Sequence, residues 1–188
     1  MNSNSDKALM MKVKNGDLDK LGLLFERYHR PLFGYFYRMS KEQEVSEDLV
    51  QSVFERLLKY RQTYSGDGKF STWLFSIARN AHIDHYRKEQ RNGVTLEIDE
   101  NRLEAEDNGQ ELLVRNKADK KEILEKALDL LEEEKREIII LSRYEGLKYK
   151  EIAELYDTTE GAVKVKMFRA MKELKNLVNQ IDKDCSYG

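Results

Sequence analysis

Apolar residues recur at helical spacing along most of the chain, and this repeat constrains the fold more than any other feature. Between Phe70 and Ala81 the apolar positions fall at i, i+3, i+4, i+7, i+8 and i+11, which line one face of an α-helix. Strict apolar–polar alternation, typical of strands, is scarce, and Pro31 is the single proline of 188 residues. The sequence therefore predicts an all-α fold.

The first of two expected helical domains covers residues 1–92. Ser5 is a suitable N-cap for a helix over residues 6–14. A second helix is expected to begin at Asp17, and Pro31 lies within its apolar pattern, which predicts either a kink or a break. Two further helices and the glycine-containing loop between them are expected at residues 46–60, 70–91 and 62–69.

An acidic segment follows the first domain. Residues 96–116 carry seven acids against two arginines and no aromatic residue, which gives −5 in a chain whose net charge is −2. Such a composition lacks the apolar residues that ordering requires, so we expect a flexible linker at residues 93–117. The second domain is then expected at 118–180, with fraying beyond Val178 and a disordered tail at 181–188.

The second domain contains a helix-turn-helix pattern. A short helix is predicted at residues 149–155, a turn at 156–158 and a longer helix at 159–174, with Thr158 and Thr159 each able to cap a helix start. Before this pattern we expect helices starting near Asp119 and spanning residues 135–144, with Gly146 as a left-handed C-cap.

The longer helix of this pattern has one apolar stripe and one cationic face. From Gly161 to Lys175 it carries five cations and one acid. Such a face suits a phosphate backbone, and the helix N-terminus could meet phosphate or base edges. The alternative is an ordinary amphipathic hairpin with a solvated lysine face.

The helix over residues 70–91 carries aromatic rings and cations on the side away from its apolar stripe. This side is formed by Phe75, Arg79, Asn80, His82, Asp84, Tyr86, Arg87 and Lys88. Stacking surfaces beside cations are suited to unpaired bases. The alternative is that the aromatic rings pack in the core.

Metal, redox and membrane functions find little support in the sequence. His82 and His85 share a helix side, but too few further ligands accompany them for a structural zinc site, so neither a metal nor another cofactor is expected. Cys185 is the single cysteine, which fits a reducing compartment. No apolar run approaches a membrane span and the start is not a signal peptide, so we expect a cytoplasmic protein without direct membrane insertion.

Four motifs, in order, resemble the sigma-70 family of bacterial sigma factors, specifically its small extracytoplasmic-function (ECF) class. Residues 24–32 resemble its region 2.1, residues 47–54 its polymerase-docking segment, residues 64–80 its −10 segment, and residues 137–174 its region 4. Where the family tends to show Thr-Val-Lys-Ser-Arg, this chain has Ala162-Val-Lys-Val-Lys166. Base preferences therefore do not transfer.

The resemblance implies a promoter-specificity subunit that binds core RNA polymerase, recognises −35 and −10 promoter DNA and helps to open the duplex. It also implies an anti-sigma factor as a partner, and no enzymatic activity. The residues expected to bind core polymerase are Asp48, Leu49, Gln51, Val53, Phe54, Arg56 and Leu57. For Leu49, Val53 and Leu57, core packing is the alternative.

The first domain is expected to bind the −10 element around an extruded base, whose capture offsets the cost of unstacking. The residues assigned to this site are Tyr64, Asp67, Lys69, Arg79, Asn80, Arg87 and Lys88.

The helix-turn-helix is expected to bind the −35 element. The residues assigned to it are Thr159, Glu160, Gly161, Lys164, Val165, Lys166, Phe168 and Arg169. Glu160 could accept from a cytosine amine, and Val165 and Phe168 could meet thymine methyl groups. For Phe168 the alternative is packing against the preceding helix.

Two other function classes are compatible with parts of the pattern. A stand-alone helix-turn-helix regulator would bind DNA without polymerase. An enzyme would use the histidine pair or the clustered acids, but the sequence shows no nucleophile, metal set or phosphate-binding glycine loop.

Overall fold

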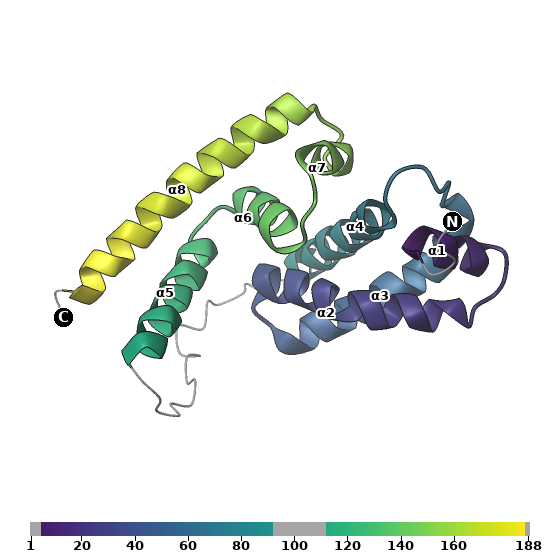
Figure 1. The fold of residues 1–188 in the computed structure, drawn as a ribbon, viewed down its shortest axis with the longest axis horizontal. Helices are drawn as coiled ribbons and strands as arrows, with labels where there is room; N and C mark the ends of the chain where they lie inside the picture. The colour runs from purple at the N-terminus through teal and green to yellow at the C-terminus, as the bar shows by residue number, and fades with distance from the viewer. Residues whose placement is uncertain (1–4, 92–111, 187–188) are drawn as a thin grey trace.

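The computed structural model describes residues 5–91 and 112–186, and throughout these ranges the regular structure is helical (Figure 1). The all-α prediction is therefore confirmed. The helices are α1 (Asp6–Lys14), α2 (Lys20–Ser40), α3 (Gln43–Tyr60), η1 (Arg61–Thr63), α4 (Phe70–Arg91), α5 (Leu112–Asp129), α6 (Glu133–Ile139), η2 (Ile140–Tyr144), α7 (Tyr149–Leu155) and α8 (Glu160–Ser186).

The helices α1–α4 form a bundle in the part of the chain expected to be the first domain. Ser5 caps α1 as predicted, since its hydroxyl accepts a hydrogen bond from the amide of Ala8 at 3.3 Å. Leu24, Leu32 and Leu57 are fully buried in the core between the helices. α2 runs on through Pro31 without a break, so of the two outcomes expected at this proline the break did not occur.

The loop between η1 and α4 is held against α1. Lys14 Nζ donates to the carbonyl of Tyr64 at 2.7 Å. Gly66 has φ +80°, and a Cβ there would lie 3.4 Å from the Lys7 side chain. The backbone therefore passes close to α1 in a conformation that glycine adopts without strain.

The second domain contains α5, α6, η2 and the helix-turn-helix pair α7–α8. Asp157 takes the left-handed conformation in the turn, with φ 47°. Thr159 Oγ1 accepts from the amide of Ala162 at 3.2 Å, which confirms Thr159 as a cap of α8. Gly146, with φ 68°, has the left-handed conformation predicted for it after η2.

Several predicted helix boundaries were wrong. α2 begins at Lys20 rather than Asp17, and α3 begins at Gln43 rather than Ser46. α5 begins at Leu112, inside the segment predicted as linker, whose residues 93–111 lie outside the described ranges. α8 continues to Ser186 rather than fraying beyond Val178, because Leu174, Leu177, Val178 and Ile181 continue its apolar stripe.

The two domains pack against each other. α7 contacts α4, and both α6 and η2 contact α2. Figure 1 shows α6 and α7 between α8 and the first bundle. This arrangement places α4, predicted to bind the −10 element, beside the helix-turn-helix.

Candidate nucleic-acid interface

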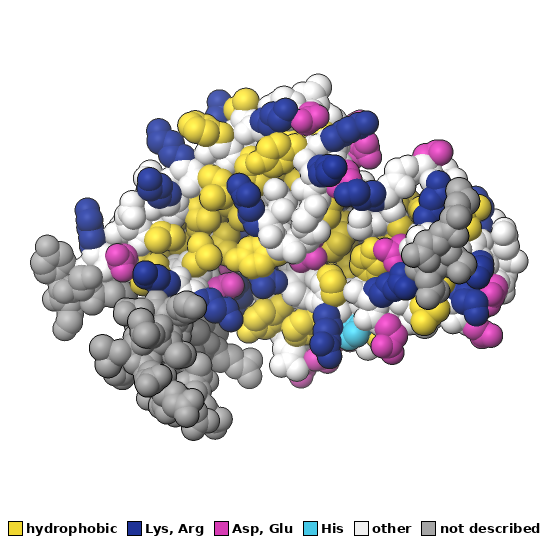
Figure 2. All heavy atoms as spheres, in the orientation of Figure 1, with side chains coloured by type: hydrophobic (Ala, Val, Ile, Leu, Met, Phe, Trp, Pro, Cys, Tyr) yellow, Lys and Arg dark blue, Asp and Glu magenta, His cyan; other side chains and the backbone are white. Residues whose placement is uncertain are grey.

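α8 separates a buried apolar face from an exposed cationic face. Val163, Met167 and Ala170 are buried, whereas Val165 is 49% and Phe168 71% exposed. Figure 2 shows Lys and Arg side chains spaced along the outer edge of α8. The exposed residues predicted for −35 binding are Thr159, Glu160, Gly161, Lys164, Val165, Phe168 and Arg169.

Two lysines of this face have acidic neighbours. Lys164 Nζ lies 2.7 Å from Glu160 one turn earlier, and its side chain stays 58% exposed. The hydrogen bond from the Lys164 ammonium group holds the pKa of Glu160 below its ordinary value. Lys166 instead pairs with Glu134 of α6 and lies near the ring of Tyr156, so it is the least available lysine of the set.

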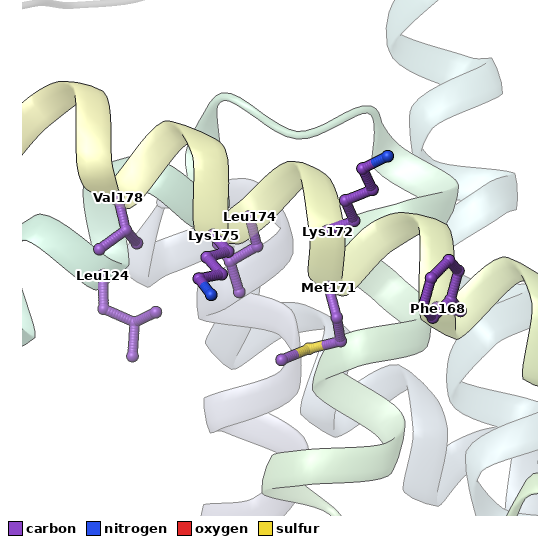
Figure 3. Close-up of a pocket in the computed structure, with 7 residues that line it drawn as sticks. All are labelled: Leu124, Phe168, Met171, Lys172, Leu174, Lys175 and Val178. Carbon is purple, nitrogen blue, oxygen red and sulfur yellow. The ribbon is translucent and has the colours of Figure 1, made fainter.

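Phe168 is 71% exposed, so burial against the preceding helix, the alternative considered for it, does not occur. It lies at one end of an apolar hollow between α8 and α5, with a volume of about 540 Å³. Figure 3 shows Leu124 and Val178 at the end of this hollow opposite Phe168. The other lining residues are Met171, Lys172, Leu174 and Lys175.

A second hollow, of about 380 Å³, lies between α3 and α4 and brings together residues from two predicted sets. Asn80 and Arg87, assigned to −10 DNA, line it together with Arg56, assigned to polymerase. Arg56 Nη1 donates to Asp84 at 2.8 Å across the hollow. Tyr60, 45% exposed, supplies an accessible ring that the sequence analysis missed.

The remaining residues assigned to −10 binding are dispersed. Tyr64 is 1% exposed and packs against Trp73 with ring centroids 5.0 Å apart, so its ring belongs to the core in this structure. Asp67 and Lys88 are exposed. Lys69 and Arg79 both pair with acids of the second domain.

The aromatic face expected on α4 is only partly accessible. Phe75 is 2% and His82 7% exposed, so both lie in the interior, as the alternative stated. Burial lowers the pKa of His82 despite the nearby Glu133 carboxylate, 3.5 Å away. Tyr86, 40% exposed, is the ring of this set that can stack on a base.

The predicted polymerase-binding set also divides by burial. Asp48 and Gln51 are exposed. Leu49, Val53, Phe54 and Leu57 are buried at 7% exposure or less, so the core alternative holds for the three aliphatic residues that had one. Phe25 of α2, 43% exposed, packs on Phe54 with centroids 4.9 Å apart and offers an apolar contact that periodicity did not single out.

Glu137 is a buried carboxylate at the junction of the two domains. It is 5% exposed and accepts hydrogen bonds from Tyr35 at 2.6 Å, from Arg79 Nε at 3.2 Å and from Tyr156. Arg79 also lies 4.3 Å over the Tyr156 ring. Burial and the carboxylate raise the pKa of Tyr35 well above its ordinary value, which keeps the phenol protonated as a donor.

The described ranges 5–91 and 112–186 contain no group of three His, Cys, Asp or Glu residues that could hold a metal ion. No helix in these ranges is both long and apolar enough to cross a membrane.

Comparison with known proteins finds two family matches. Residues 24–92 match Sigma-70 region 2, and residues 121–174 match Sigma-70, region 4. The match to region 2 includes α3, α4 and most of α2, and the match to region 4 includes the helix-turn-helix.

Similar proteins extend these matches over most of the chain. The ECF RNA polymerase sigma factor SigX of Bacillus subtilis is 33% identical over 158 residues, which covers 81% of this chain and 80% of SigX. The ECF RNA polymerase sigma factor BldN of Streptomyces coelicolor is 31% identical over 186 residues, covering 94% and 68%. The structure of CnrH in complex with the cytosolic domain of CnrY matches with a TM-score of 0.69 at 21% identity, over 93% of this chain and 97% of CnrH.

Proposed function

Because this chain belongs to the ECF class of the sigma-70 family, it is an RNA polymerase sigma factor, and we propose which surfaces carry that function. The helix-turn-helix α7–α8 reads the −35 element. The surface of α3 and α4 contacts the −10 element and core polymerase. Neither surface performs a chemical step, so promoter opening is driven by binding alone.

The exposed face of α8 carries this proposal. Lys164 and Arg169 flank the apolar side chains of Val165 and Phe168, and all four are exposed. Cations of this kind neutralise phosphates and fix the register, whereas apolar side chains contact thymine methyl groups in the major groove. The alternative, a solvated lysine face without a partner, does not explain why Phe168 is 71% exposed at the centre of this face.

For the −10 element we propose the hollow between α3 and α4. Asn80 and Tyr60 line this hollow, where Asn80 offers donor and acceptor atoms to a base edge and Tyr60 offers a ring for stacking. Tyr86 of α4, outside the lining, offers a second exposed ring. Arg87 and Lys88 are exposed cations for phosphates. Arg56 lines the same hollow and is therefore proposed to contact −10 DNA rather than core polymerase.

Core polymerase is proposed to dock on the exposed residues of α3 beside α2. Asp48 and Gln51 supply polar contacts, and Phe25 supplies an apolar one. An anti-sigma factor is a further proposed partner, since the similar solved structure of RpoE from Bartonella quintana is a complex with the anti-sigma factor NepR. The stand-alone regulator is not retained, because the family matches cover both sigma regions.

Replacement of Lys164 by Ala tests whether the exposed face of α8 binds DNA. If Lys164 neutralises one phosphate, the slope of log K against log salt for duplex DNA should become less negative by about 0.9. Fluorescence anisotropy with a labelled mixed-sequence duplex at several salt concentrations measures this slope.

Lys121→Ala is the matched control, because Lys121 is an exposed lysine of the same domain that belongs to α5 rather than to α8. Its slope should equal that of the unchanged protein. Equal slopes for Lys164→Ala and the unchanged protein would remove Lys164 from the DNA contacts.

A further inference from the structure

Two hydrogen bonds that run in opposite directions join the C-terminal end of α1 to η1, the short helix that follows α3. Lys14, the last residue of α1, donates from Nζ to the carbonyl of Tyr64 at 2.7 Å. Gln62 of η1 donates from Nε2 to the carbonyl of Lys14 at 2.9 Å. The last carbonyls of a helix have no partner within the helix, so Gln62 satisfies a group that α1 leaves open. Two segments 48 residues apart are thereby fixed to each other.

α1 is itself anchored in the bundle. Its apolar side chains Leu9, Met10 and Val13 are each 1% exposed or less. Near its start, Asp6 accepts a hydrogen bond from the Tyr28 hydroxyl of α2 at 2.8 Å. Movement of α1 would expose the three buried side chains to water, which is unfavourable. The end of α1 is therefore a fixed support for η1.

η1 passes this support on to the last turn of α3. Arg61 Nη1 donates to the carbonyl of Leu58 at 2.7 Å, and Thr63 Oγ1 donates to the carbonyl of Tyr60 at 2.8 Å. Tyr60 directly precedes η1 and lines the hollow between α3 and α4. Helix ends fray unless they are held. Fraying at η1 would therefore move the Tyr60 ring relative to Asn80 on the facing helix.

Lys14 lies outside the parts of the chain that identify the family. The match to Sigma-70 region 2 begins at residue 24, so neither family match includes α1. The ammonium group of Lys14 is engaged with a backbone carbonyl, and the residue is only partly exposed. Its geometry is thus that of a support for η1 rather than that of a phosphate contact.

We infer that Lys14 is a positioning residue of the −10 site, which acts through η1 to hold the Tyr60 ring where a base can stack on it. Gln62 is its partner in this role. A ring that is already in place when DNA arrives does not have to be ordered at the moment of binding, so affinity is gained without a further contact to DNA. The inference rests on the proposed stacking of a base on Tyr60.

Replacement of Lys14 by Met tests this role in the full chain, because Met keeps an apolar stem and removes the ammonium donor. Affinity for a labelled mixed-sequence 20-nucleotide single strand should fall about fivefold, since the Tyr60 ring loses its fixed position. The slope of log K against log salt should stay the same, because no phosphate contact is removed. Affinity for a mixed-sequence duplex, which α8 is proposed to bind, should also stay the same. Fluorescence anisotropy measures all three quantities.

Lys14→Arg should keep the single-strand affinity of the unchanged protein, since a guanidinium group can still donate to the Tyr64 carbonyl. Lys12→Met is the matched control, because Lys12 is an exposed lysine of the same helix, and it should also bind like the unchanged protein. Gln62→Leu removes the second hydrogen bond at an exposed position and should weaken single-strand binding as Lys14→Met does. Circular dichroism verifies that each variant is folded.

A double-mutant cycle with Tyr60→Ala shows whether Lys14 acts through this ring. Tyr60→Ala alone should weaken single-strand binding about tenfold, because one stacking contact is lost. Once the ring is absent, Lys14→Met should weaken binding little further.

Three results would overturn the positioning role: full single-strand affinity in both Lys14→Met and Gln62→Leu, an undiminished effect of Lys14→Met in the Tyr60→Ala background, or a salt slope for Lys14→Met that is less negative by about 0.7, as loss of one phosphate contact would give. Unchanged binding by Tyr60→Ala would instead overturn the proposed stacking on Tyr60, and the inference with it.

Discussion

At the scale of single residues, the burial of Glu145 makes the stability of the fold depend on pH. Burial raises the pKa of its carboxyl from 4.5 to about 7, although the nearby Arg38 lowers it. Arg38 also lies 4.0 Å over the ring of Tyr144, so these residues join α2 to η2. An ionised Glu145 therefore opposes folding at the junction of the domains.

Glu145→Gln should raise the free energy of unfolding in a pH-dependent manner. Below pH 4.5 the carboxyl is protonated in both states, between 4.5 and 7 only the folded state holds the proton, and above 7 both states are ionised. The increase in the free energy of unfolding that Gln causes should therefore grow between pH 4.5 and 7 and then level off. Because solvent screens the partly exposed carboxylate, the final increase should be on the order of 1 kcal/mol. Urea unfolding at several pH values measures it.

The exposed Glu154 provides the comparison, since Glu154→Gln should show a gain that changes little over this pH range. A gain from Glu145→Gln that is largest at pH 4.5 would contradict the account.

At the scale of residues, the sequence predicted which side chains are exposed where only local pattern mattered. The cationic face of α8 followed from helical spacing, and the exposure of Lys164 and Phe168 agrees with it. Tyr64 was misplaced because η1 and the loop turn its ring between Phe70 and Trp73, a contact that periodicity does not encode. The partner of Arg79 lies 58 residues away, beyond any local signal.

At the scale of elements, the start of α8 combines helix stability with DNA approach. Gly161 lies in the first turn of α8, and a Cβ there would meet only Thr159 Oγ1, at 3.9 Å. The fold therefore tolerates alanine at this position. Under the proposed function, glycine at this position lets the backbone of α8 come close to DNA.

Gly161→Ala should change stability and binding in opposite directions. Alanine should raise the free energy of unfolding by up to about 1 kcal/mol, because glycine is the poorer helix former. The added methyl group should weaken promoter duplex binding by about tenfold, or about 1.4 kcal/mol. Thermal unfolding and anisotropy titration with a duplex that carries the −35 element measure the two effects.

Gly22→Ala in α2 is the matched control, since it is also a helical glycine and no atom lies within 4 Å of its Cβ position. It should raise stability without changing DNA binding. If Gly161→Ala binds DNA as tightly as Gly22→Ala, close approach at Gly161 is excluded.

The elements themselves were largely predictable. α1, α4 and α7 match their predicted spans, with Ser5 marking the start of α1 and an apolar stripe marking α4. The missed end of α8 had a signal in Leu177, Val178 and Ile181, which continue the stripe and pack on the core. The early start of α3 had no such signal, since Glu42 precedes it without a side-chain cap.

At the scale of the whole molecule, the sequence predicted two domains but not their contact. The composition of residues 93–117 suggested a tether that permits many arrangements. The arrangement of the domains depends on pairs such as Glu137 with Tyr35, 102 residues apart, which only the assembled fold brings together. The contact between the domains is therefore a property of the whole molecule rather than of either domain.

Transcription by purified bacterial core RNA polymerase on a library of genomic promoter fragments tests the central claim most directly. With this protein added, the account predicts discrete transcripts that start at fixed positions, and these should be lost with Lys164→Ala, Arg169→Ala on the exposed face of α8. Transcripts that are the same with and without the protein would contradict its function as a sigma factor.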